Sequence, residues 1–84
     1  MSKKEKLLAK LCARPSPKNF PWQYFVTLMG YYGFTTTCSS GSHYMFEHSS
    51  GFRFSMSKTH PSGMLKSYQI RDAKKALKHI GVTP

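Results

Sequence analysis

Acidic side chains are scarce in this 84-residue sequence, which contains three Asp and Glu residues against thirteen Lys and Arg. Glu5, Glu47 and Asp72 lie in three distant segments, whereas a nuclease that uses two metal ions needs several carboxylates that converge on magnesium. The sequence therefore disfavours a metal-dependent nuclease and, for the same reason, a hydrolase built on paired carboxylates. The formal net charge of +10 instead predicts a polyanionic partner, of which nucleic acid is the commonest. An acidic protein and a membrane surface are the weaker alternatives.

Cysteine is equally rare, since the chain contains only Cys12 and Cys38. The sequence has no C-x-x-C or H-x-x-x-H spacing of the kind that binds zinc. His43 and His48 lie five residues apart on one predicted strand and would point to opposite faces. No segment approaches the length of a transmembrane helix, and no signal-peptide pattern is present. We therefore expect a cytoplasmic protein with two free thiols, no metal site, no cofactor and no membrane association.

The length is that of one small domain, and its N-terminal side predicts two helices. The first covers residues 2–12 and ends before the stretch R-P-S-P at 14–17, because proline cannot continue a helix. The second begins near Pro21, ends before Gly33 and places these core candidates at helical spacing: Trp22, Phe25, Val26, Met29 and Tyr32. We predict a single domain over residues 1–84, with residues 1–14 as an N-terminal helical extension and residues 19–82 as the core.

The pattern changes from helical to strand-like after the second helix. Strands are predicted over residues 34–38, 43–48 and 52–57, with turns between them at 39–42 and 49–51. A final helix is predicted from about Tyr68 to His79, with lysines along its outer side. The element order α-α-β-β-β-α indicates an α+β fold, in which helices pack on one face of a three-stranded antiparallel sheet.

His43 follows a Ser-Gly-Ser turn and begins the 43–48 strand. Alternation along this strand sends Tyr44 and Phe46 to one face, and His43, Met45 and Glu47 to the other. An isolated histidine in such a hairpin is most simply a surface residue, and we predict that role for His48 and His79.

A chemical role for His43 is the sharper hypothesis. An RNA 2′-hydroxyl can attack the adjacent phosphate if a base removes its proton and a cation stabilises the transition state. That reaction needs a histidine and some Lys or Arg, but no metal ion. The sequence offers His43 for it, with Arg53, Lys58, His60 and Lys66 in segments that could converge.

Several short motifs also resemble those of a known family. They are W-x-x-F at 22–25, Y-Y-G-F at 31–34, S-G-S-H at 40–43, F-x-H at 46–48, H-P at 60–61 and L-K-S-Y-Q-I-R at 65–71. In this order, over Leu7 to Val82, they resemble the HicA toxins, which are small mRNA interferases of type II toxin–antitoxin systems. The resemblance implies a fold like that of double-stranded-RNA-binding domains. It also implies metal-independent cleavage of mRNA by His43, with Gly41 and Ser42 shaping its turn, and an antitoxin of the HicB family that neutralises the toxin.

Two main functions therefore stay open. In the first, a ribonuclease toxin, His43 is the base, Lys58 or Arg53 offsets phosphate charge, and His60 is the candidate donor of a proton to the leaving 5′-oxygen. In the second, a non-catalytic RNA-binding module of the same fold, only well-placed cations are needed. The candidate RNA-binding residues in both cases are Arg53, Lys58, Lys66, Lys74, Lys75 and Lys78. A weaker third hypothesis is a protein-interaction domain whose basic face docks an acidic partner.

Overall fold

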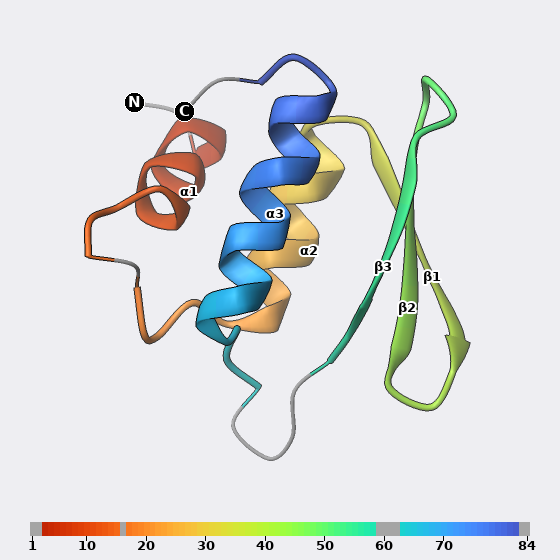
Figure 1. The fold of residues 1–84 in the computed structure, drawn as a ribbon, viewed down its shortest axis with the longest axis horizontal. Coiled ribbons are helices and arrows are strands. Elements are labelled where there is room, and N and C mark those ends of the chain that lie inside the picture. The colour runs from red at the N-terminus through yellow and green to blue at the C-terminus, as the bar shows by residue number, and fades with distance from the viewer. Residues whose placement is uncertain (1–2, 16, 59–62, 83–84) are drawn as a thin grey trace.

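The computed structural model describes residues 3–15, 17–58 and 63–82, which form helices and one sheet (Figure 1). In chain order the elements are α1 (Lys3–Leu11), α2 (Trp22–Tyr31), β1 (Phe34–Ser40), β2 (His43–His48), β3 (Arg53–Ser57) and α3 (Ser67–His79). This order confirms the α+β fold predicted from the sequence. No helix of the described part of the chain is both long and apolar enough to cross a membrane.

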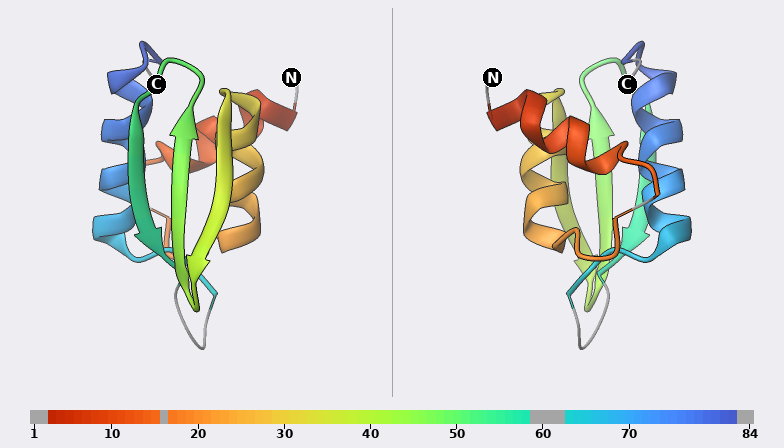
Figure 2. Two further views of the ribbon diagram at one scale, coloured as in Figure 1. Left: turned by 90° about the vertical axis from the view of Figure 1, so that its right-hand side faces the viewer. Right: turned by 90° about the vertical axis from the view of Figure 1, so that its left-hand side faces the viewer.

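The sheet is covered on one face. Its strands are antiparallel in the order β1-β2-β3. Helices α2 and α3 lie against the same face, and α1 lies across them on the side away from the sheet (Figure 1 and Figure 2). The predicted packing of helices on one face is therefore confirmed, with α1 as a third layer. Within the described residues, no helix or strand covers the other face of the sheet, which we call the open face.

The length of β1 is the clearest difference from the sequence prediction, because the strand continues through Ser39 and Ser40. Cys38 pairs with Tyr44 and Ser40 pairs with His43, so residue 39 is an extra residue in a β-bulge. The Ser39 hydroxyl donates a hydrogen bond to the His43 carbonyl at 3.1 Å. Small polar residues suggested a longer turn, but continued pairing leaves only Gly41 and Ser42 to make it.

The covered face of the sheet is aromatic and forms the centre of the core. Phe46 of β2 is fully buried, with its ring centroid 5.1 Å from that of Phe25 and 5.0 Å from that of Phe54. Burying a side chain of this size stabilises a fold by about 1.5–3 kcal/mol. The predicted core residues Trp22, Phe25 and Met29 of α2 are buried, whereas Val26 and Tyr32 are only partly buried.

Candidate functional site

The turn between β1 and β2 places His43 at one end of the sheet. Gly41 adopts a φ of 53°, a left-handed conformation that glycine accepts without strain. The backbone N–H of Lys58 donates to the Ser42 carbonyl at 2.8 Å, which ties the turn to the residue that follows β3. His43 is exposed on the open face, as the strand alternation predicted. The backbone around this imidazole is therefore fixed from two sides.

Ser57 orients the His43 ring. The two residues are direct partners in the β2–β3 ladder, and His43 Nδ1 lies 3.2 Å from Ser57 Oγ. This hydrogen bond occupies Nδ1 and leaves Nε2 as the nitrogen that can exchange a proton with a bound molecule. For Nε2 to accept a proton, the neutral ring must carry its hydrogen on Nδ1, which then donates to the serine oxygen.

A polar groove opens beside this histidine, between β3 and the first turns of α3. It has a volume of about 330 Å³. We call it the His43 groove, and its lining residues are His43, Ser55, Met56, Ser57, Tyr68, Gln69 and Asp72. The groove combines an imidazole and hydroxyl groups, which can hydrogen-bond a ribose or a phosphate, with one carboxylate, which can accept a hydrogen bond from a ribose hydroxyl.

Gln69 holds the two sides of the His43 groove together. Its side chain is 1% exposed, donates from Nε2 to the Ser57 carbonyl at 2.8 Å and accepts at Oε1 from the Lys66 backbone N–H at 2.9 Å. The second bond caps the start of α3, where backbone N–H groups have no partner within the helix. Gln69 thus fixes the end of β3, and with it Ser57, relative to α3.

Two of the candidate cations lie at the His43 end of the molecule. Lys58 directly follows β3, and Lys66 directly precedes α3, where it is exposed. Arg53 lies elsewhere, since it pairs with Glu47 four positions along β3 from Ser57, or about 13 Å at the rise of a strand. The expected convergence of Arg53 with His43 is therefore wrong, because the length of β3 separates Arg53 from Ser57, the residue that pairs with His43. His60 lies outside the described residues.

Lys74 and Lys78 are four residues apart on α3 and share one side of the helix, whereas Lys75 lies on the side toward β3. Lys74 is half-buried on the side toward α1, and its charge acts on Cys12. Burial raises the pKa of the Cys12 thiol, and the positive charge of Lys74 opposes that rise. Lys75 faces β3. Lys78 is exposed, and at the helical rise it lies about 18 Å from Lys66 along the axis of α3. None of these three lysines lines the His43 groove.

The described residues contain no group of three or more His, Cys, Asp or Glu side chains placed to hold a metal ion. Comparisons of the chain with protein-family models, with curated proteins and with solved structures find no match. The candidate site is therefore defined by its own geometry. Six residues that line the His43 groove were not predicted as site residues from the sequence: Ser55, Met56, Ser57, Tyr68, Gln69 and Asp72.

Proposed function

We propose that this chain is an endoribonuclease that cleaves RNA without a metal ion and uses His43 as its general base. The observation that supports it most directly is the placement of His43. Its imidazole is exposed at a polar groove, and Ser57 holds it through Nδ1 so that Nε2 is available. The net charge of +10 supports a polyanionic substrate.

The proposed reaction uses the nucleophile that RNA itself carries. Nε2 of His43 takes the proton of the 2′-hydroxyl, and the 2′-oxygen forms a bond to the adjacent phosphorus. The bond from phosphorus to the 5′-oxygen breaks, which leaves a 2′,3′-cyclic phosphate and a 5′-oxygen that takes up a proton. Lys58 and Lys66 lie at the same end of the molecule as His43 and can offset the charge on the phosphate. His60 stays the proton donor predicted from the sequence.

The biological role that we propose follows from the sequence motifs. Because they resemble those of HicA toxins, we propose that the substrate is mRNA and that cleavage inhibits translation and growth in the cytoplasm. A HicB-like antitoxin protein would neutralise this activity. The scarcity of acids in the chain makes a partner with acidic groups the natural complement of its surface.

The test is cleavage of a labelled RNA by the wild type and by His43→Ala, in the presence of a chelator. We expect the variant to lose about 10²- to 10⁴-fold in rate, with RNA affinity nearly unchanged. His48→Ala is the matched control, since His48 lies on the same strand and faces the helices. A substrate with 2′-deoxyribose at the cleaved position should resist the wild type. Full activity of His43→Ala, or loss of wild-type activity with the chelator, would disprove the proposed mechanism.

A non-catalytic RNA-binding module is the second candidate, and the open, polar face of the sheet favours it together with the charge. In that case the wild type would bind RNA in competitor but leave RNA ends and cell growth unchanged on expression. His43→Ala would then bind RNA as the wild type does.

A further inference from the structure

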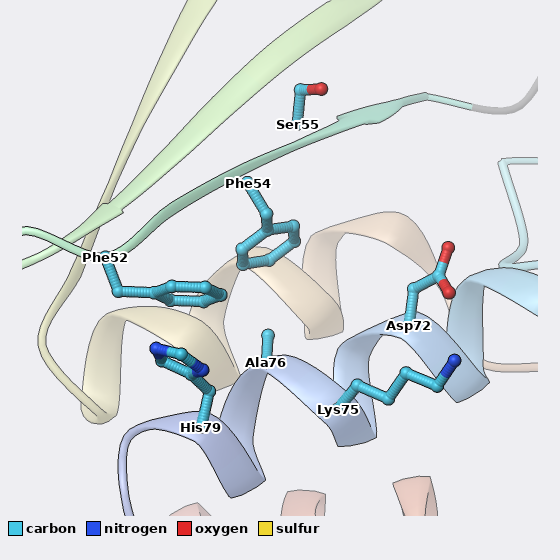
Figure 3. Close-up of a pocket in the computed structure, with 7 residues that line it drawn as sticks. All are labelled: Phe52, Phe54, Ser55, Asp72, Lys75, Ala76 and His79. Carbon is cyan, nitrogen blue, oxygen red and sulfur yellow. The ribbon is translucent and has the colours of Figure 1, made fainter.

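A second groove adjoins the His43 groove, and Figure 3 shows the side chains that line it. It has a volume of about 300 Å³ and lies between β3 and the later turns of α3. We call it the His79 groove and define it by Phe52, Phe54, Asp72, Lys75 and His79. Ser55 and Asp72 line both grooves. A strand of RNA bound at His43 can therefore extend into the His79 groove without leaving the surface.

Aromatic rings form one end of the His79 groove. The rings of Phe52 and His79 are stacked, with their centroids 4.1 Å apart and their planes 23° apart. Phe52 is in turn packed against Phe34 and Phe54, whereas His79 is exposed. Phe52 thus supports one face of the exposed His79 ring. An exposed ring of this kind is the usual platform for an unpaired base in single-stranded RNA.

Two opposite charges lie on the helix side of the same groove. Asp72 and Lys75 are one turn apart on α3, and Figure 3 shows both side chains beside the groove. Lys75 can hold a phosphate. A carboxylate opposes phosphate binding, but it accepts hydrogen bonds from the amino groups of bases. Asp72 is one of three acids in the chain, so its presence at this point of a basic surface fits a role in reading a base.

We propose that the His79 groove binds a nucleobase of the RNA strand, next to the nucleotide that is cleaved at His43. This inference rests on the proposed function. The base stacks on His79, and Lys75 binds the neighbouring phosphate. Asp72 determines specificity, because its carboxylate accepts a hydrogen bond from an exocyclic amino group. Cytosine carries that group at the position where uracil carries a carbonyl oxygen. The groove therefore prefers cytosine to uracil, although the two bases have the same size.

The experiment is an NMR titration of the ¹⁵N-labelled protein with short 2′-O-methyl oligocytidylate and oligouridylate. Their blocked 2′-oxygens prevent cleavage, so binding is measured alone. We expect the amides of Phe54, Ala76 and His79 to shift, and the cytosine oligomer to bind about five-fold more tightly or better. His79→Ala should weaken binding of both oligomers about five-fold. Asp72→Asn should remove the preference between them, since an amide can also donate to a carbonyl oxygen.

The lysines provide a matched control. Lys75→Ala should weaken the binding of both oligomers equally. Lys78→Ala removes the same charge from the same helix outside the groove and should weaken binding less. Tyr31→Ala removes an exposed aromatic ring on another helix and should leave the preference intact. Thermal unfolding of each variant confirms that it is folded.

The two proposals fail in different ways. Shifts that gather elsewhere on the molecule, or equal affinity of the two oligomers for the wild type, would overturn the base site even if the protein cleaves RNA. A preference that Asp72→Asn retains would overturn the role of Asp72. Conversely, a wild type that binds as expected but never cleaves RNA would overturn the nuclease and leave the base site standing, and His43→Ala should show the same preference as the wild type.

Discussion

The two faces of the sheet differ sharply although the same three strands build them. The face under α2 and α3 carries aromatic side chains and Met56, and Phe46 on this face is fully buried. The open face carries small and polar side chains, among them Thr35, Ser55 and His43. Because neighbours along a strand point to opposite faces, residues that stabilise the fold alternate with residues that could do chemistry. Single substitutions should therefore separate stability from function.

The largest expected effect compares two neighbours in β2. Phe46→Ala should lower the free energy of unfolding by about 3–5 kcal/mol, because it removes a ring that contacts Phe25 and Phe54. Met45→Ala, on the open face with 36% of its surface exposed, should lower it by less than about 1 kcal/mol. Denaturant unfolding of both variants measures the difference. Equal losses would mean that the open face is covered and that the two faces are not distinct.

Most of the fold could be predicted from the sequence because its signals are local. The helical spacing of Trp22, Phe25 and Met29 marks a buried helix face, and alternation in residues 43–48 assigns each side chain to a face of the sheet. The bulge at Ser39 could not be predicted, since small polar residues suit both a turn and an edge strand. What decides between them is pairing with β2, which is a contact between segments.

The site was harder to predict than the fold. His43 was found because a turn motif precedes it, but its partner Ser57 lies fourteen residues away. The sequence held a usable signal, because a hairpin centred on Ser50 pairs His43 with Ser57. Gln69 gave a weaker one, as a polar residue next to Ile70 on the apolar side of α3. The stacking of Phe52 on His79 had no local signal, because it depends on how α3 packs against β3.

Gln69 joins the open face to the helical layer, and breaking its two bonds should have the next largest effect. Gln69→Met keeps a similar side-chain volume but leaves the Ser57 carbonyl and the Lys66 N–H without these partners. We expect a loss of about 1–3 kcal/mol in the free energy of unfolding, measured by denaturant unfolding. Gln23→Met, the same change at an exposed position of α2, should change it by less than about 0.5 kcal/mol. Similar losses in both variants would show that Gln69 is not a structural link.

The smallest expected effect concerns the bond between His43 and Ser57 on the open face. Ser57→Ala removes the acceptor for Nδ1, so we expect the cleavage rate constant to fall about 3- to 10-fold, the worth of one hydrogen bond. Thr35→Ala removes a hydroxyl from the same face of the sheet, outside the His43 groove, and should leave the rate constant unchanged. Ser57→Thr should restore it because the hydroxyl is retained.

A spectroscopic measurement then distinguishes orientation of the ring from a general loss of structure. The ¹⁵N chemical shifts of the His43 ring report which nitrogen carries the hydrogen. The proposed mechanism requires the Nδ1–H form, in which the Ser57 hydroxyl, 3.2 Å away, accepts the hydrogen of Nδ1. Ser57→Ala should shift the population toward the Nε2–H form, in which Nε2 cannot act as a base. An unchanged population in a folded variant with a slower rate would mean that Ser57 acts on the substrate and does not orient His43.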